Sequence, residues 1–176
     1  MSKLSLHKPV KLFVGFIGND PDVICKAQGM LSGKFGEVDL ESPAMDFNFT
    51  DYYNDELGDN LKRKFICFKK LIAPEKAYRM KIMTNRVESK FSIRSKRRVN
   101  IDPGYISLGN LMLLTGKDHY HRIYIGKGVY AEVTLYYKDK KFRALEWTYP
   151  DYKSPVNLDI FLKMRERYLN QLNGAG

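Results

Sequence analysis

The most constraining feature of the sequence is a glycine-bounded turn between two stretches of alternating residues. Residues 121–125 (HRIYI) precede Gly126, Lys127 and Gly128, and residues 129–137 (VYAEVTLYY) follow them. A three-residue loop that ends in a left-handed glycine closes an antiparallel hairpin and fixes which residues lie opposite each other. Among the short-loop registers, only this one leaves one face of the hairpin largely apolar. The sequence therefore predicts two paired antiparallel strands at 121–125 and 129–137.

This register gives the hairpin a polar face with an acid–base pair. Tyr124 lies opposite Tyr130, and Arg122 lies opposite Glu132. The pair is either a cross-strand ion pair on a half-exposed sheet, worth about 0.2–1 kcal/mol, or a functional group. In the functional interpretation Arg122 binds an anion, and Glu132 orients the guanidinium or acts as a base. His121 falls on the apolar face, where we expect a hydrogen-bonding role.

The remaining patterns extend this hairpin into an α+β fold. Further strands are predicted at 11–18, 38–41, 45–49, 62–71 and 141–147, and helices at 21–35, 74–91, 106–114 and 155–173. Their order predicts a two-layer α+β sandwich with a mostly antiparallel sheet and helices on one face. The first half is ferredoxin-like, and a C-terminal meander and a terminal helix follow it. A length of 176 residues fits one domain, which we place at 8–172.

Composition excludes several classes of protein. No apolar run approaches the roughly 20 residues of a membrane-spanning helix, and residues 1–10 lack the apolar segment of a secretory signal. Cys25 and Cys67 are too few for a disulfide scaffold, and we expect both in the core. The sequence therefore predicts a cytoplasmic protein without a membrane anchor. It assigns no metal ligands and identifies no cofactor.

Charge is segregated along the chain. Residues 37–60 contain eight acids and no Lys or Arg, whereas residues 61–98 contain fourteen bases and two acids, within a chain of net charge +10. The basic segment could bind a polyanion, the two segments could neutralise each other, or the chain could self-associate. If nucleic acid is the partner, the expected contacts are Arg94, Lys96, Arg97 and Arg98.

A second group of polar residues lies outside the hairpin. Asp102 precedes a proline, which restricts Asp102 to an extended backbone and fixes the direction of its carboxylate. Asp102 and Asn100 either cap the helix predicted at 106–114 or present polar groups beside the hairpin. A divalent ion held by His119 and His121 together with Asp102 or Glu132 is a further alternative. Acid–aromatic segments either wall a pocket or pack over the core, and they contribute Asp51, Tyr52 and Trp147.

Together these residues favour binding of a small phosphorylated or otherwise anionic metabolite or nucleotide, and they leave open whether the protein is an enzyme. The candidate catalytic residues are Glu132, Asp102 and His121. The candidate ligand contacts are Arg122, Asn100, Tyr124, Tyr130, Trp147, Asp51 and Tyr52. Two alternatives remain: an RNA-binding module that uses residues 61–98, and an adaptor without chemistry.

Several strings of the sequence resemble a known family. They are KPVKLFVG at 8–15, FTDYY at 49–53, NIDPGY at 100–105, YAEVTL at 130–135 and WTYPDY at 147–152. Together they are similar to the bacterial and archaeal proteins of domain of unknown function 4416, nearly from end to end. The resemblance implies a single-domain, cytoplasmic, prokaryotic protein and implies no activity. Some members carry a GTP-binding label, but this chain has neither a Gly-x-x-x-x-Gly-Lys-Ser/Thr loop nor an Asn-Lys-x-Asp motif.

Overall fold

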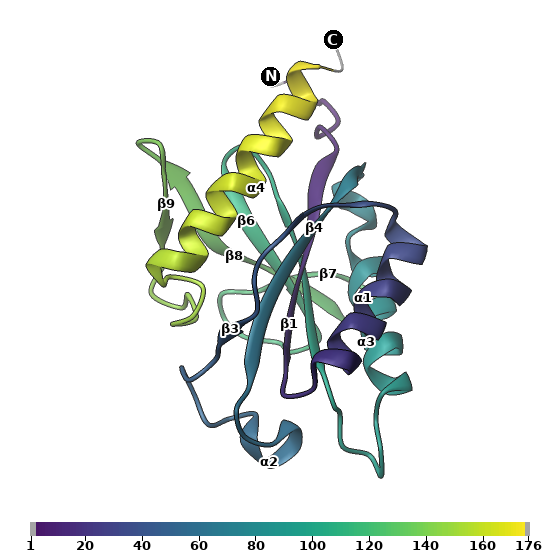
Figure 1. The fold of residues 1–176 in the computed structure, drawn as a ribbon. Coiled ribbons are helices and arrows are strands. Elements are labelled where there is room, and N and C mark those ends of the chain that lie inside the picture. Colours follow the sequence, from purple (N-terminus) through teal and green to yellow (C-terminus); the bar gives the residue numbers. More distant parts are fainter. Residues whose placement is uncertain (1–2, 175–176) are drawn as a thin grey trace.

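A single nine-stranded sheet organises the chain, and the computed structural model describes residues 3–174 (Figure 1). The strands are β1 (Val10–Gly18), β2 (Val38–Glu41), β3 (Met45–Asp46), β4 (Lys62–Ile72), β5 (Asn100–Ile106), β6 (Asn110–Thr115), β7 (Ile123–Gly126), β8 (Val129–Lys138) and β9 (Lys141–Ala144). The helices are α1 (Pro21–Phe35), α2 (Asn54–Leu57), α3 (Tyr78–Lys90) and α4 (Pro155–Asn173), with a 3₁₀ helix η1 (Pro74–Lys76). Within residues 3–174, no helix has both the length and the apolar character needed to cross a membrane.

The sheet is antiparallel throughout and has the order β2-β4-β1-β5-β6-β8-β7, while β3 pairs with β4 and β9 with β8. The elements from β1 to β5 follow a β-α-β-β-α-β connectivity, with β1 and β4 side by side at the centre of their half. This is the ferredoxin-like arrangement that the sequence predicts. The α+β class, the antiparallel sheet and the C-terminal helix are therefore confirmed.

The helices cover both faces of the sheet, whereas the sequence analysis predicted them on one face only. Successive side chains of β1 point to opposite faces. Leu12, Val14 and Phe16 pack against α1 and α3, while Phe13 contacts Phe161 of α4 with 5.8 Å between ring centroids. Helical periodicity identifies the apolar side of a helix but does not say which sheet face it meets. Because β1 is buried along its whole length, both faces were available.

The prediction of a helix at 106–114 is wrong, because this segment contains the last residue of β5 and most of β6. Leu111 and Leu113 pack in the cluster beneath α4, whereas Met112 and Leu114 pack toward α3. A strand buried on both faces consists of consecutive apolar residues without alternation. Such a short run cannot be distinguished from a buried helix by periodicity alone.

The hairpin register predicted for β7 and β8 is confirmed. Tyr124 pairs with Tyr130, and Ile123 pairs with Ala131. The turn is tighter than predicted, since pairing extends to Gly126. The two loop residues that follow have φ values of 56° and 76°, which suits a two-residue hairpin turn with positive φ at both positions.

The two cysteines occupy different environments. Cys67 is buried in β4, as expected. Cys25 is exposed, which corrects the expectation that it lies in the core. The buried side of α1 is formed by other residues, namely Val23, Ile24, Ala27 and Leu31.

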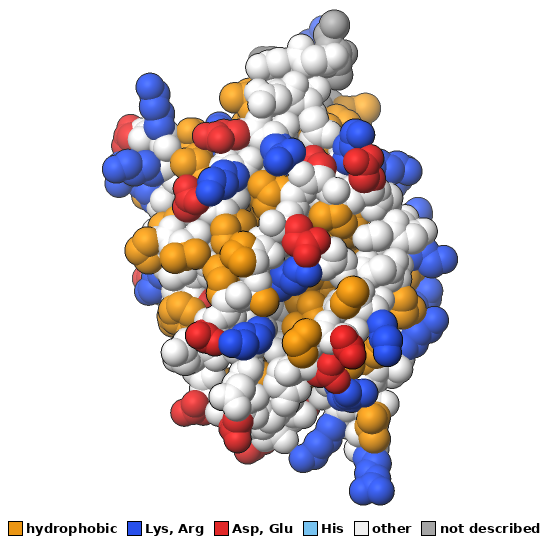
Figure 2. All heavy atoms as spheres, viewed as in Figure 1, with side chains coloured by type: hydrophobic (Ala, Val, Ile, Leu, Met, Phe, Trp, Pro, Cys, Tyr) orange, Lys and Arg blue, Asp and Glu red, His pale blue; other side chains and the backbone are white. Residues whose placement is uncertain are grey.

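The acidic segment 37–60 and the basic segment 61–98 lie against each other in the fold. Acidic and basic side chains are interspersed on the face seen in Figure 2. Four ion pairs join the two segments: Lys62–Asp46, Lys64–Glu41, Lys69–Glu37 and Arg97–Glu56. Of the three alternatives left open by the charge pattern, these contacts favour neutralisation within the chain.

Candidate functional site

The sheet splits between β5 and β6, and a cavity of about 840 Å³ lies at the split. The two strands pair only where Gly104–Ile106 meet Leu111–Leu113. On the other side of Pro103, β5 stays paired with β1 while β6 stays paired with β8. Pro103 has no N–H group to donate to a neighbouring strand, and it stands where the pairing stops.

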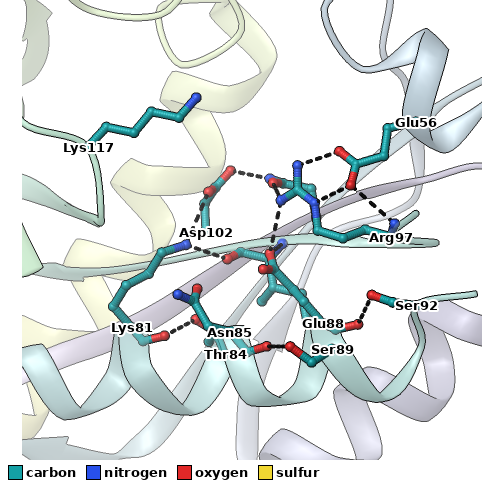
Figure 3. Close-up of polar contacts among 12 residues, drawn as sticks. Glu56, Lys81, Thr84, Asn85, Glu88, Ser89, Ser92, Arg97, Asp102 and Lys117 are labelled. Atoms are coloured by element: carbon teal, nitrogen blue, oxygen red, sulfur yellow. Dashed lines mark hydrogen bonds and ion pairs between the residues drawn. The ribbon is translucent and has the colours of Figure 1, made fainter. Parts of the chain in front are cut away.

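Strands, one helix and four loops line this cavity. Figure 3 shows Lys81 and Glu88 reaching from α3 toward Asp102, with Lys117 on another side. The charged lining residues are Arg63, Lys81, Glu88, Arg97, Asp102, Lys117, Arg122, Glu132 and Asp151. Six aromatic residues also line the wall, namely Phe47, Phe49, Tyr52, Tyr53, Tyr149 and Tyr152.

Side chains of α3 take the place of a neighbouring strand along the open edge of β5. The Ile101 N–H donates to Glu88 Oε1 at 2.5 Å, and Lys81 Nζ donates to the Ile101 carbonyl oxygen at 3.3 Å. Leaving such a buried group without a partner would cost about 1–3 kcal/mol. Burial raises the pKa of Glu88, and the charge of Lys81 opposes this rise. These two side chains thus stabilise the split.

Arg63 of β4 is a deeply buried cation of the cavity, with a side chain only 3% exposed. Its Nη2 donates to Asp151 at 2.6 Å, and its guanidinium carbon lies 4.7 Å from the Phe65 ring centroid and 5.0 Å from that of Tyr152. Nε and Nη1 have no hydrogen-bond partner, although an Asp102 oxygen lies 3.7 Å from Nη1. Buried donors without acceptors are rare, and Arg63 keeps two unused, solvent-inaccessible donor groups beside the cavity.

Gly15 of β1 makes room for this guanidinium. It pairs with Phe65 of β4 on one side and with Asp102 of β5 on the other. A Cβ atom at Gly15 would lie 2.8 Å from the Phe65 ring and 3.2 Å from Arg63 Nη1. A side chain here would push against the guanidinium, so the position of Arg63 depends on a residue with no side chain.

Asp102 and Asn100 lie in the cavity, but on strand β5 rather than in a turn before a helix as predicted. Asp102 Oδ2 accepts a hydrogen bond from Asn100 Nδ2 at 2.7 Å. The Asp102 carboxylate is also within 3.7 Å of Arg63 and 4.0 Å of Lys81. Asp102 therefore lies between two cations on the cavity wall.

The Arg122–Glu132 pair forms as the register predicts, and it is buried rather than half-exposed. Arg122 Nε donates to Glu132 Oε2 at 2.7 Å, with side chains 8% and 1% exposed. The other Arg122 nitrogens donate to the Lys117 carbonyl oxygen at 3.0 Å and to the Tyr149 hydroxyl at 2.8 Å. Glu132 Oε1 accepts from Thr134 at 3.2 Å. Since both Glu132 oxygens are engaged, the geometry favours an orienting role over that of a base.

His121 and Trp147 lie outside the cavity lining. His121 contacts Glu132, and Trp147 packs against His121. His121 Nε2 is 3.0 Å from Glu132 Oε2, and its ring stacks on Trp147 at 4.9 Å between centroids. The expected position of His121 on the apolar face is wrong, because regular pairing begins only after it, at Ile123. His121 Nδ1 is 3.0 Å from Nδ1 of His119. Among residues 3–174, no group of three or more His, Cys, Asp or Glu side chains is placed to hold a metal ion.

The remaining predicted ligand contacts divide between the surface and the cavity mouth. Tyr124 and Tyr130 contact each other at 5.2 Å between centroids, outside the cavity lining. Asp51 is exposed and also lies outside the lining. Tyr52 belongs to the lining, and its hydroxyl accepts a hydrogen bond from Lys117 Nζ at 2.9 Å. This bond lowers the pKa of Tyr52.

One member of the predicted nucleic-acid cluster, Arg97, lines the cavity. Its Nε and Nη2 donate to Glu56 at 2.7 Å and 2.6 Å, and its Nη1 donates to Asn100 at 2.7 Å (Figure 3). The bond to Glu56 raises the pKa of Arg97 and lowers that of Glu56. The other members lie outside the lining, at Arg94, Lys96 and Arg98.

The sequence analysis missed several charged residues of the cavity. Lys81, Asn85 and Glu88 follow an i, i+4, i+7 spacing on α3, and this polar stripe was a detectable signal. Arg63 and Asp151 had no such signal. Arg63 stands in a run of three bases, and Asp151 stands in an irregular aromatic segment.

Comparison with known proteins identifies a family that spans the whole cavity. The model of the family described as Domain of unknown function (DUF4416) matches residues 8–168. This range contains every lining residue, from Ile17 to Tyr152. No curated protein and no solved structure matches the chain.

Proposed function

We propose that this chain, which belongs to the Domain of unknown function (DUF4416) family, binds a small anionic compound in the cavity between β5 and β6. Phosphorylated metabolites and nucleotides are the candidate class. The observation that carries the proposal is the guanidinium of Arg63, a cavity-lining residue whose buried Nε and Nη1 have no hydrogen-bond partner. A cytoplasmic location, where such compounds are made and consumed, is part of this proposal.

The donors at the inner end of the cavity exceed what the protein itself uses. An ammonium group has three protons, and Lys81 Nζ makes one hydrogen bond, to the Ile101 carbonyl oxygen. Together with the free Arg63 groups, this provides several donors for the oxygens of a phosphate or carboxylate. Charge-assisted hydrogen bonds of this kind are roughly twice as strong as neutral ones. An anion is therefore the ligand whose chemistry complements this wall.

Asp102 adds an acceptor beside these donors. A hydroxyl group or a protonated phosphate oxygen can donate to it, so the site suits a compound that carries both an anionic group and such a donor. Asp102 is also the carboxylate best placed to take a proton from a bound compound, because Glu132 is occupied by Arg122 and His121. Asp102 can therefore act as a hydrogen-bond acceptor for the ligand whether or not the protein catalyses a reaction.

Binding is tested by isothermal titration calorimetry and thermal unfolding of the wild-type chain with inorganic phosphate, sugar phosphates, nucleotides and dicarboxylates. At least one of these anions is expected to bind and to raise the melting temperature. Arg63→Lys keeps the charge but loses the planar donor fork, and we expect at least a tenfold loss of affinity for that anion. If no anion binds the wild-type chain, the proposal is wrong.

A matched control is needed because Arg63→Lys also disturbs a buried residue. Arg143→Lys alters an exposed arginine of β9 that pairs with Asp139, and it should leave affinity unchanged. Lys81→Met removes the second cation, and affinity should fall here too. Each shift in melting temperature is referred to the unliganded variant, so that a loss of basal stability is not mistaken for a loss of binding.

A further inference from the structure

A continuous row of aromatic side chains leads from Arg63 to the mouth of the cavity. The Arg63 guanidinium carbon lies 5.7 Å from the Phe47 ring centroid. Phe47 lies 5.8 Å from Phe49 and 6.0 Å from Tyr53, and Tyr53 lies 5.0 Å from Tyr52. Along this row the exposed fraction rises from 7% at Phe47 to 42% at Phe49 and 64% at Tyr52. The row thus connects a buried cation with solvent.

Two rings at the mouth, Phe49 and Tyr52, are exposed to solvent. The chain has ten phenylalanines, all within the described residues, and only Phe49 is exposed. Burying apolar area yields roughly 25 cal/mol per Å², so leaving a phenylalanine in water at a cavity mouth is unfavourable in the free protein. A ligand that covers Phe49 would recover that area.

Two tyrosine rings near the mouth of the cavity are fixed by hydrogen bonds. Lys117 Nζ donates to the Tyr52 hydroxyl at 2.9 Å and lies 4.9 Å from the centre of its ring. Tyr149, another ring of the lining, is fixed through its hydroxyl by Arg122 at 2.8 Å. Rings fixed in this way lose little freedom when a ligand stacks on them, which favours binding.

From this arrangement we infer that the ligand is an aromatic anion, with its charged group at Arg63 and a flat ring against Phe49 or Tyr52. This inference rests on the proposed function and narrows it to phosphate esters that carry an aryl or heteroaryl ring, a class that includes phenyl phosphate and the nucleoside monophosphates. Rings associate in offset or edge-to-face contacts at 4.5–7 Å between centroids. A cavity of about 840 Å³ lies within the usual size of sites for such ligands. Sugar phosphates without a ring of this kind would leave the aromatic row uncovered.

The test compares four phosphate monoesters by isothermal titration calorimetry with the wild-type chain. Phenyl phosphate and adenosine monophosphate carry an aromatic ring, whereas ribose 5-phosphate and hexyl phosphate do not. We expect both aromatic esters to bind at least tenfold more tightly than both of the others. Hexyl phosphate is included because an apolar but non-aromatic preference would make it equal to phenyl phosphate, which would overturn the inference.

Two variants remove rings while keeping apolar side chains at exposed positions. In at least one of Phe49→Leu and Tyr52→Leu, the ratio of phenyl phosphate to ribose 5-phosphate affinity should fall at least threefold, with the affinity for ribose 5-phosphate unchanged. Tyr124→Leu is the control, because Tyr124 is 59% exposed and lies outside the lining, and its ratio should match the wild type.

The outcomes separate this inference from the proposed function. If all four esters bind alike, or if both ring variants keep the wild-type affinity ratio, the inference of an aromatic ligand is wrong and the proposed anion binding stands. If inorganic phosphate, every ester and the dicarboxylates fail to bind the wild-type chain, the proposed function fails and the inference fails with it.

Discussion

At the scale of single residues, the position of the Arg63 guanidinium depends on the absence of a side chain at Gly15. In Gly15→Ala the new Cβ would meet the Phe65 ring at 2.8 Å and Arg63 Nη1 at 3.2 Å. Phe65 is held between Tyr152 and Phe161, so Arg63 must shift. We expect a loss of about 1–3 kcal/mol in the free energy of unfolding, as overpacking usually causes, together with weaker anion binding. Urea denaturation and calorimetry measure the two effects.

The control for this substitution is a glycine with free space around it. Gly29 lies in helix α1, and an added Cβ would have no atom within 4 Å. Gly29→Ala should stabilise the chain by about 0.5–1 kcal/mol, because glycine in a helix interior is unfavourable relative to alanine. A Gly15→Ala variant that gained stability as Gly29→Ala does would contradict the role assigned to Gly15.

Glu88 gives a pH-dependent prediction. Burial raises the pKa of its carboxyl group in the folded chain, so the folded state holds this proton more tightly than the unfolded state does. Stability from this group is complete below the unfolded pKa of about 4.3 and is lost as pH rises through the folded pKa. Glu88→Gln removes the titration and keeps an oxygen that can accept from the Ile101 N–H. The stability of the variant relative to wild type should therefore increase with pH.

Urea unfolding of both proteins between about pH 4 and about pH 7 measures this difference, which isolates Glu88 from the other groups that titrate there. A relative stability that falls with pH would show that the nearby cations Lys81 and Arg97 outweigh the desolvation of the carboxylate.

At the scale of elements, the two hairpins show what local sequence determines. The β7–β8 register follows from the turn residues and from alternation, and both signals are local. The β5–β6 hairpin has consecutive buried residues, which fitted a helix equally well, and its turn signal at Ser107, Gly109 and Asn110 was overlooked. The split beside Pro103 could not be predicted from the sequence. It depends on Lys81 and Glu88, which contact Ile101 from helix α3 on one face of the sheet.

The same distinction applies to the site. Arg122, Glu132 and Asp102 could be selected from register and backbone restriction. Arg63 could not, because a base within Lys62–Lys64 is recognised as buried only when α4 and the segment that carries Asp151 are known to cover that face of the sheet.

The burial of the Arg122–Glu132 pair predicts a particular pattern of stability. Removing one charge leaves the other buried and unpaired, which typically costs about 3–5 kcal/mol, whereas replacing both with apolar residues is often nearly neutral. Glu132→Leu should therefore destabilise the chain more than the double variant Arg122→Met, Glu132→Leu. Urea denaturation of wild type, both single variants and the double variant completes the comparison. Effects below about 1 kcal/mol in every variant would indicate a solvent-exposed pair.

At the scale of the whole molecule, the acidic and basic segments form ion pairs with each other. The pairs that join residues 37–60 to residues 61–98 occupy bases that a nucleic acid would otherwise use. Members of the predicted contact cluster are engaged as well. Arg98 pairs with Asp20, and Lys96 donates to the Asp55 carbonyl oxygen. The fourteen bases of residues 61–98 therefore overstate the positive surface that this region presents to a polyanion.

This neutralisation predicts weak binding to nucleic acid with little salt dependence. Fluorescence anisotropy with short single-stranded RNA and duplex DNA at about 50 mM salt, where the electrostatic contribution is strong, should show no saturable binding by the wild-type chain. Neutralising the acidic partners should release four bases, and the variant required is Glu37→Gln, Glu41→Gln, Asp46→Asn and Glu56→Gln. Binding of single-stranded RNA by this variant should then fall with salt with a logarithmic slope of about −3, as expected for four phosphate contacts. Saturable binding by the wild-type chain, abolished by reversing Arg94, Lys96, Arg97 and Arg98, would instead support the nucleic-acid alternative, because only unpaired bases can release counterions from a phosphate backbone.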